Sequence, residues 1–349
     1  MWRRECRLAV EVVRVTEDSY DVVVVGGGAA GLNGALMLAR SRRSVLVVDA
    51  GEPRNAPADG VHGLLALDGT PPAELLARGR AEVARYGGEL VTGEVAAVTR
   101  AGERFAVTLA DGRTVRARRV LVATGLVDRL PDVPGLRERW GRDVLHCPYC
   151  HGWEVRDQAI GVLASGPMSV HQTLLFRQLS RDVTYFAHTR PPTGEQAEQL
   201  AALGIPVVTG EVTGLEVVAD RLVGVRLAGG SVVPRQAVAV ATRMEARAGF
   251  LAPLGLRAVE HTAGVGEQLP ADPVGRTEVP GVWVAGNVTD LSAQVGASAA
   301  AGATAGAQIN ADLVAEDARL ALEAHRNPFG AGMEARVSER MLAGRQHGF

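Results

Sequence analysis

The chain has 349 residues, 47% of them hydrophobic and 22% charged, with a formal net charge of −2. This composition is typical of a globular protein of about two domains, and the near-zero charge argues against partners such as nucleic acid or an anionic membrane. No apolar run reaches the ~20 residues of a membrane-spanning helix. Charged residues interrupt the first twenty positions, so we expect a short extension there, not a signal peptide, and a cytoplasmic protein.

The first predicted unit consists of a strand, a glycine-rich turn, a helix and a second strand. Residues 21–25, DVVVV, are typical of a buried parallel strand. The apolar spacing of residues 32–39 is helical, and the second strand ends at Asp49. Together these segments predict one βαβ unit.

The turn between this strand and helix fits the G-x-G-x-x-G pattern of dinucleotide-binding proteins. Gly26 permits the tight turn, Gly28 lets backbone N–H groups approach a pyrophosphate, and Gly31 allows the helix to pack closely on the strand. Asp49 stands close to the spacing expected of the residue that binds a ribose. The predicted cofactor-binding residues of this unit are Gly26, Gly28, Ala29, Ala30, Gly31 and Asp49.

Two stretches of alternating polarity, residues 104–119 and 215–234, predict antiparallel hairpins or meanders. Their turns are expected at Asp111-Gly112 and at Gly229-Gly230. Residues 118–125, at the end of the first of these stretches, predict a further buried strand that runs into a turn.

A second strand–turn–helix–strand unit is predicted over residues 159–189, and residues 279–316 predict a strand, a Gly-Asn turn and a long Ala-rich helix. The chain therefore carries two nucleotide-type units. The order of the segments suggests that the second unit is inserted within the first.

The stretch LHCPYCHGWE, residues 145–154, holds two of the three cysteines, Cys147 and Cys150. Taken alone, C-x-x-C-H fits covalent haem attachment, a zinc site or a redox dithiol. Covalent haem attachment needs export of the protein. A zinc ion needs two further ligands, and His146 and His151 lie too close to the cysteines to complete a tetrahedral site easily. The third cysteine lies in the N-terminal extension, and we expect it to be an incidental surface thiol.

Two short segments, residues 120–125 and 279–287, resemble those by which two-dinucleotide flavoproteins close around FAD. The resemblance places Thr124 and Gly125 beside the adenine half of the cofactor. It places Gly286 and Asn287 at the ribityl and phosphate region, where such proteins usually carry Gly-Asp.

An asparagine at this position can still donate a hydrogen bond to, or accept one from, a ribityl hydroxyl, so we expect FAD to be retained. The helix that begins near Gln294 and Val295 is expected to direct the positive end of its dipole at the flavin. Asn55 and His62, in the loop of residues 53–63, are further candidates for contact with the flavin.

With these motifs in this order, the chain resembles low-molecular-weight thioredoxin reductases over roughly residues 20–315. The resemblance implies an α/β fold of two Rossmann-like three-layer domains, the second inserted into the first, and a homodimer. The expected division is an extension of residues 1–19, an FAD-binding domain of 20–128 and 249–322, an inserted NAD(P)H-binding-like domain of 129–248 with the CPYC dithiol, and a tail of 323–349.

The same resemblance implies that Cys147 is the outer sulfur, which exchanges with substrate, and that Cys150 passes electrons to the flavin. Typical thioredoxin reductases carry an acidic residue where this chain has His151. CPYCHGWE is similar to the motif of dithiol oxidases of the gliotoxin and holomycin type, which close disulfides in natural-product biosynthesis. Both His146 and His151 are candidate bases for the thiol protons, although either ring can also have a purely structural role.

The second predicted nucleotide turn, ASGPMS at residues 164–169, departs from the G-x-G-x-x-G pattern. Only Gly166 remains, Ala164 disfavours a positive φ, and Pro167 removes one N–H group from the helix start. Arg190 has no adjacent arginine with which to hold a 2′-phosphate. We therefore favour a dithiol oxidase with a small-molecule dithiol and dioxygen as partners. An NADPH-dependent disulfide reductase and a non-catalytic flavoprotein sensor stay open, and no metal is expected.

Overall fold

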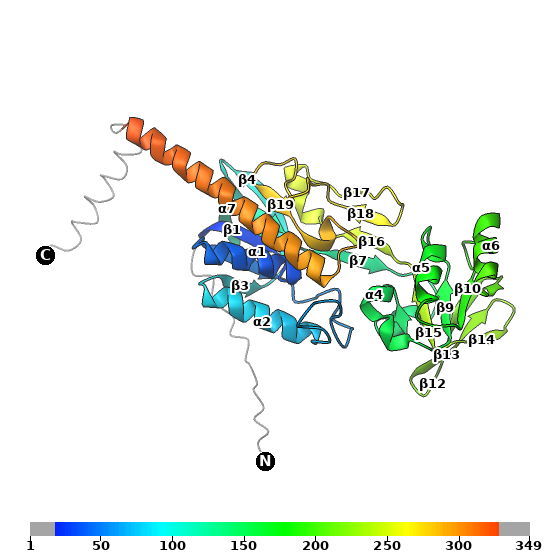
Figure 1. Cartoon of the computed structure of the whole chain (residues 1–349). Coiled ribbons are helices and arrows are strands. Elements are labelled where there is room, and N and C mark those ends of the chain that lie inside the picture. The colour runs from blue at the N-terminus through cyan, green and yellow to red at the C-terminus, as the bar shows by residue number, and fades with distance from the viewer. Residues whose placement is uncertain (1–17, 328–349) are drawn as a thin grey trace, which may run out of the picture.

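The computed structural model describes residues 18–327. The predicted extension up to residue 17, including its cysteine, and the predicted tail from residue 328 onward lie outside these described residues. The described chain forms a larger and a smaller part that lie side by side (Figure 1). Within residues 18–327, no helix combines the length and the apolar character needed to cross a bilayer.

The larger part is built on a seven-stranded sheet in the order β3-β2-β1-β6-β5-β4, with β19 paired to the second half of β6. Strands β3, β2, β1, β6 and β19 are parallel, whereas β5 and the first half of β6 form the predicted antiparallel hairpin, to which β4 adds a further antiparallel strand that was not predicted. Because β19 comes from the far end of the chain, both ends contribute to one sheet. The strands are β1 (Ser19–Val25), β2 (Val45–Asp49), β3 (Glu89–Thr92), β4 (Val95–Ala101), β5 (Arg104–Leu109), β6 (Thr114–Val122) and β19 (Val282–Val284).

Helices α1 (Ala29–Arg40), α2 (Pro72–Arg85) and α7 (Val295–Arg326) cover this sheet. The Gly- and Ala-rich start of α7 lies directly against α1, as Figure 1 shows. A Cβ atom at Gly302 would stand 1.9 Å from the Ala30 carbonyl oxygen. The small residues of the long helix are therefore required for this close crossing.

The smaller part contains a five-stranded parallel sheet in the order β11-β10-β9-β15-β8 and a separate meander of β12, β13 and β14. The predicted strand–turn–helix–strand unit forms β9, α5 and β10. The elements are β8 (Val144–Leu145), α4 (Pro148–His151), β9 (Ile160–Leu163), α5 (Ser169–Phe176), β10 (Val183–Phe186), α6 (Gly194–Ala202), β11 (Val207–Val208), β12 (Val212–Val218), β13 (Arg221–Leu227), β14 (Val232–Pro234) and β15 (Ala237–Val240).

The meander has a turn that the sequence pattern did not reveal. Besides the predicted turn at Gly229-Gly230, the chain reverses at Ala219 and Asp220, whose φ angles are 49° and 59°. Left-handed backbone is unfavourable for residues other than glycine. Here the Asp220 carboxylate accepts hydrogen bonds from Arg139 and Arg142, which hold the turn in place.

Two short strands connect the two parts. The chain leaves the larger part along β7 (Leu126–Arg129) and returns along β16 (Arg243–Ala246), and these strands pair antiparallel. Strands β18 (Gly266–Gln268) and β17 (Val259–Glu260) extend this small sheet. The expected domain boundaries near residues 128 and 249 lie close to this crossing.

Candidate functional site

A cavity of about 810 Å³ lies where the larger and smaller parts meet. Its volume is within the ~300–1,000 Å³ that is usual for small-molecule and cofactor sites. Apart from Gly31, every site residue predicted from the sequence lines it. These residues are Cys147, Cys150, His151 and His146, and Gly26, Gly28, Ala29, Ala30, Asp49, Asn55, His62, Thr124, Gly125, Gly286, Asn287, Gln294 and Val295.

The first glycine turn has the geometry that its sequence predicts. Gly26 has a φ of 103°, which favours glycine. Gly31 lies beneath the turn, where a Cβ atom would stand 1.8 Å from the Gly26 carbonyl oxygen. Within residues 18–327 and apart from its chain neighbours and the backbone of its own helix, no protein atom lies within 4 Å of the position of a Cβ atom on Gly28, which faces the cavity. The turn therefore leaves open space where a dinucleotide would approach the backbone.

Asp49 lies at the end of β2 and lines the cavity, but both of its carboxylate oxygens already bind groups of the protein itself. Oδ1 accepts a hydrogen bond from the Gly27 N–H at 3.0 Å, and Oδ2 lies 3.2 Å from the Arg80 guanidinium. A Cβ atom on Gly27 would stand 2.7 Å from Cγ of Asp49. We missed Gly27 in the sequence, although it is the middle residue of the GGG run.

The predicted adenine-side residues are fixed to the strand crossing. Thr124 Oγ1 donates to the Arg247 carbonyl at 2.7 Å, and the Arg247 N–H donates to the Gly125 carbonyl at 3.1 Å. Gly125 has a φ of 68°, so this turn also favours glycine. The bonds hold the end of β6 against the strand that returns from the smaller part.

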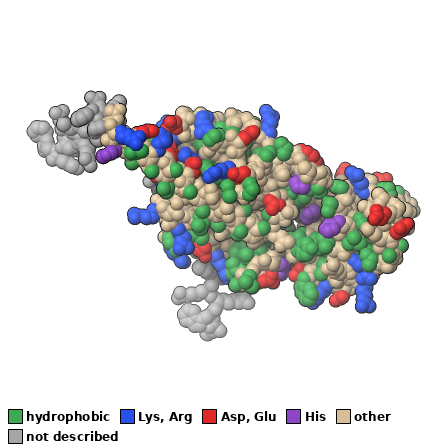
Figure 2. Space-filling view, turned by 45° about the horizontal axis from the view of Figure 1, so that its top comes forward, with side chains coloured by type: hydrophobic (Ala, Val, Ile, Leu, Met, Phe, Trp, Pro, Cys, Tyr) green, Lys and Arg blue, Asp and Glu red, His purple; other side chains and the backbone are tan. Residues whose placement is uncertain are grey.

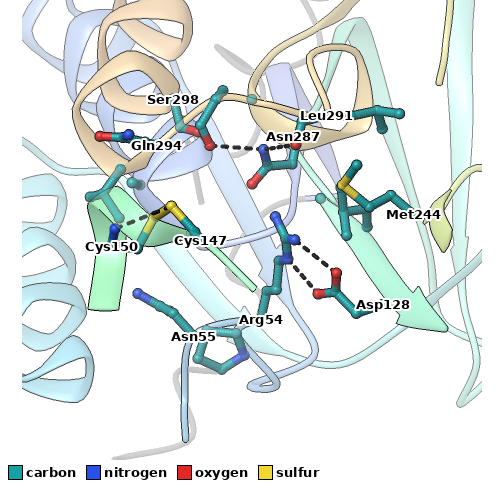
Figure 3. A pocket seen from close by; sticks show the side chains of 18 of the residues that line it. Arg54, Asn55, Asp128, Cys147, Cys150, Met244, Asn287, Leu291, Gln294 and Ser298 are labelled. Carbon is teal, nitrogen blue, oxygen red and sulfur yellow. Dashed lines mark hydrogen bonds and ion pairs between the residues drawn. A yellow bond between two sulfur atoms is a disulfide. The ribbon is translucent and has the colours of Figure 1, made fainter. Parts of the chain in front are cut away.

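Asn287 also lines the cavity, and its side chain organises the start of α7. Its Nδ2 donates to the carbonyl oxygens of Asp290 at 2.9 Å and Ala293 at 2.8 Å. Figure 3 shows dashed bonds leaving this nitrogen on both sides, between the labelled Ser298 and Leu291. Within residues 18–327, its Oδ1 accepts no hydrogen bond and is available to a ligand. Gln294 is the N-cap residue of the 32-residue helix α7 and lines the cavity, so the positive end of this helix faces the cavity.

The two cysteines form a disulfide across the short helix α4. Cys147 is the N-cap residue, and its Sγ accepts a hydrogen bond from the Cys150 N–H at 3.1 Å. Pro148 occupies the first helical position, where its missing N–H has no cost. The pair faces the same space as Arg54 and Asn287 (Figure 3).

The two flanking histidines differ in how they are held. His146 Nδ1 lies 3.1 Å from the Val240 carbonyl oxygen, so this nitrogen carries the proton and Nε2 is left to accept one. Burial lowers the pKa of His146, and the nearby Arg54 charge lowers it further. His151 lies at the end of α4 and also lines the cavity.

Arg54 and Asp128 form an ion pair in the cavity that sequence reasoning missed. The guanidinium meets the carboxylate through two hydrogen bonds, of 2.6 and 2.8 Å, and Thr242 donates to Asp128 at 2.6 Å. Burial alone would raise the pKa of Asp128, but the hydrogen bonds and the charge of Arg54 outweigh it and lower the pKa. The position of Arg54 next to Asn55 is the only signal that the sequence offers.

The loop that carries Asn55 and His62 reaches the smaller part. His62 Nε2 lies 3.3 Å from Glu154 of the CHGWE segment, and Nδ1 lies 3.4 Å from Asp68. His62 thus lines the cavity and also bridges the two parts. Figure 2 shows histidine side chains at this junction. The cavity-lining histidines are His62, His146, His151, His171 and His261.

The second nucleotide turn uses its polar groups internally. Ser169 Oγ bonds with both the N–H and the carbonyl of Gly166, at 3.2 and 2.9 Å. His188 Nδ1 accepts the Val212 N–H at 3.0 Å. These groups are therefore not free to bind a phosphate. Across residues 18–327, no three His, Cys, Asp or Glu side chains are grouped so that they could hold a metal ion.

Comparison with known proteins identifies the type of protein. The profile of the family described as pyridine nucleotide-disulphide oxidoreductase matches residues 20–307. Thioredoxin reductase tcpT of Claviceps purpurea (strain 20.1) is 32% identical over 284 residues, which is 78% of this chain and 87% of that protein. Thioredoxin reductase sirT of Leptosphaeria maculans is 34% identical, over 48% of this chain and 51% of its own.

Two solved structures share the fold at useful sequence identity. The crystal structure of HlmI is 48% identical, with a TM-score of 0.85 over 90% of this chain and 98% of that chain. The oxidoreductase from Agrobacterium tumefaciens is 34% identical, with a TM-score of 0.80 over 85% of this chain and 99% of that chain.

Proposed function

The chain belongs to the pyridine nucleotide-disulphide oxidoreductase family, and from that premise we propose that it oxidises a small-molecule dithiol to an intramolecular disulfide, with dioxygen as final acceptor. Its thioredoxin reductase-like members are FAD-binding flavoproteins, and FAD is the cofactor of this chain. The residues present fit that cofactor, since Gly28 leaves open space at the cavity wall and Asn287 has a free Oδ1. The glycine turn, Asn287 and Gln294 would hold it.

One observation carries the choice of an oxidase. The sulfur pair shares its cavity with the intact glycine turn, whereas the second turn has Pro167 and has tied its Gly166 N–H to Ser169. A nicotinamide nucleotide needs free N–H groups at such a turn to bind its phosphates. If that nucleotide does not bind, the electrons have to come from the substrate thiols.

The thiol exchange uses the chain's own disulfide. A substrate thiolate attacks Sγ of Cys147, which forms a mixed disulfide and releases the Cys150 thiolate. The second substrate thiolate attacks the substrate sulfur of that mixed disulfide, which closes the product disulfide and releases the Cys147 thiolate. FAD, when bound, supplies the two-electron acceptor between this dithiol and dioxygen, so that one dithiol and one dioxygen give one disulfide and one hydrogen peroxide.

The surroundings of the sulfurs suit this exchange. The Cys150 N–H that reaches Sγ of Cys147 at 3.1 Å would stabilise a thiolate there, which favours the second step, in which the product disulfide closes and the Cys147 thiolate is released. The Nε2 atom of neutral His146 can take a thiol proton, and His151 is the second candidate.

The pH dependence of kcat/KM should show the lowered pKa of His146. Only the neutral ring accepts a proton, and because burial keeps its pKa below the ordinary 6.5, activity should persist below pH 6.5 and fall as the pH drops through the lowered pKa. His146→Gln should reduce kcat/KM by about 100-fold and remove this acid limb. A profile in which His151→Gln removes the limb and His146→Gln does not would assign the base to His151.

The function is tested by anaerobic reduction of the bound flavin. Addition of NADPH should leave the visible flavin absorbance unchanged. Subsequent addition of dithiothreitol should bleach that absorbance within the time of one catalytic cycle, which is the turnover time 1/kcat. Readmission of air should restore the absorbance and produce peroxide in equal amount to the dithiol consumed. Bleaching by NADPH within the turnover time would overturn the oxidase proposal.

The alternative is an NADPH-dependent disulfide reductase, and the names of the relatives favour it, because tcpT and sirT are both called thioredoxin reductases. A third possibility, a flavoprotein sensor without turnover, predicts that neither reagent bleaches the flavin at a useful rate. We also propose that the protein is a cytoplasmic homodimer and that its substrate comes from natural-product biosynthesis.

A further inference from the structure

The helix that follows the altered nucleotide turn faces the redox cavity. Met168 immediately precedes α5, and Met168, His171, Gln172 and Leu175 line the cavity that holds the disulfide. The N-terminus of such a helix receives a phosphate in nucleotide-binding units. Here its side chains line the cavity that holds the sulfur pair instead.

Apart from its histidines, this end of the cavity has no ionisable side chain of residues 18–327 that is charged at neutral pH, and it includes the apolar side chains of Met168 and Leu175. The charged lining residues come from the larger part and from the connecting strands: Asp49, Glu52, Arg54, Glu94, Asp128 and Arg247. In the described chain, the lining residues of α4 and α5 include no carboxylate, ammonium or guanidinium group. Tyr149, which lies between the two cysteines, is 66% exposed, and Met168, which lines the same cavity, is 41% exposed. Exposed apolar side chains around a reactive group indicate a binding surface.

Gln172 connects α5 to the redox loop, which is the segment of residues 146–151 that carries the disulfide. Its side chain is 6% exposed, and Nε2 donates to the carbonyl oxygen of His146 at 2.6 Å, directly before Cys147. Its Oε1 is buried and, within residues 18–327, has no hydrogen-bond partner. An unpaired buried acceptor in a cavity wall is expected to gain a donor when the cavity is filled.

We propose that the cavity-facing side of α5, formed by Met168, His171, Gln172 and Leu175, binds the scaffold of the substrate. The substrate is then a compact, uncharged and largely apolar molecule that carries both thiols and a hydrogen-bond donor. The inference rests on the proposed function, and it adds that the former nucleotide-binding helix determines substrate choice. A pocket of this kind combines apolar walls with a few placed polar groups.

The test compares Met168→Glu with Met37→Glu. Met37 is the same residue type, is 39% exposed on α1 and lies outside the cavity, so it is the matched control. The substrates are ortho-xylylenedithiol, which is apolar, and dithiothreitol, which is hydrophilic and closes a ring of the same size. Met168→Glu should raise KM for ortho-xylylenedithiol about 10-fold with kcat nearly unchanged, and should leave KM for dithiothreitol within about twofold. Met168→Leu should keep the parent KM.

Binding of the cyclic disulfide of ortho-xylylenedithiol, measured by calorimetry on the FAD-loaded protein, gives a readout without turnover. Met168→Glu should weaken this binding about 10-fold relative to Met37→Glu. Equal binding by the two variants would overturn the inference even if both oxidise dithiols normally. If the parent protein oxidises neither dithiol, the proposed function fails, and the calorimetry still decides whether α5 binds an apolar scaffold.

Discussion

Replacement of Cys150 by serine is expected to lower dithiol turnover by at least about 10,000-fold. Cys147 and Cys150 act as one catalytic unit, and loss of one residue of such a unit removes nearly all of its catalysis. The disulfide between Cys147 and Cys150 is the electron acceptor for the substrate, and it cannot form in the variant. FAD should remain bound, since Cys150 contributes no atom to the glycine turn. The measurement is peroxide release under substrate saturation, with the flavin spectrum as the check on folding.

Cys6→Ser is the matched control, because it removes the remaining cysteine of the chain. It should leave turnover within about twofold of the parent. In a Cys6→Ser background, Cys147 of the Cys150→Ser variant should react faster with Ellman's reagent than Cys150 of the Cys147→Ser variant. Residual turnover above about 1% in Cys150→Ser would contradict the exchange through this pair, and a reversed order of reactivity would exchange the two sulfur roles.

The parts of the site that could be predicted from the sequence are those formed by residues close together along the chain. Gly26 needs a positive φ, and Gly31 needs close approach of helix and strand, so each leaves a fixed residue type at a fixed spacing. The C-x-x-C pair likewise places both sulfurs within one turn of chain. Fold and cofactor follow from such local patterns and from their order along the chain.

The parts that the sequence did not reveal depend on contacts between distant segments. Arg54 meets Asp128 only because the loop after β2 folds over the strand crossing, and Gln172 reaches His146 only because α5 lies against the redox loop. No periodicity marks such pairs. The crossing strands β7 and β16 have four residues each, which is too short for a period of two to be recognised.

Gly28→Ala is expected to weaken FAD binding about 10- to 100-fold while leaving the FAD-free protein as stable as the parent. Its φ of −80° and ψ of −171° suit any residue, and among the residues that the structure describes a Cβ atom would meet no atom within 4 Å beyond its chain neighbours and the backbone of its own helix. The added methyl group would instead occupy the space that the dinucleotide needs, and overpacking of this kind costs about 1–3 kcal/mol. The measurements are fluorescence titration of FAD into the FAD-free protein and its thermal unfolding.

Two further glycines separate the cofactor effect from a folding effect. Gly194, at the start of α6, also has open space around a Cβ position but lies outside the cavity, so Gly194→Ala should leave FAD affinity unchanged and should not lower stability. Gly31→Ala should lower stability even without FAD, because its Cβ atom would stand 1.8 Å from the Gly26 carbonyl oxygen. If Gly28→Ala bound FAD as tightly as Gly194→Ala, the open space at Gly28 would not be where the cofactor approaches, and the assignment of the glycine turn would fail with it.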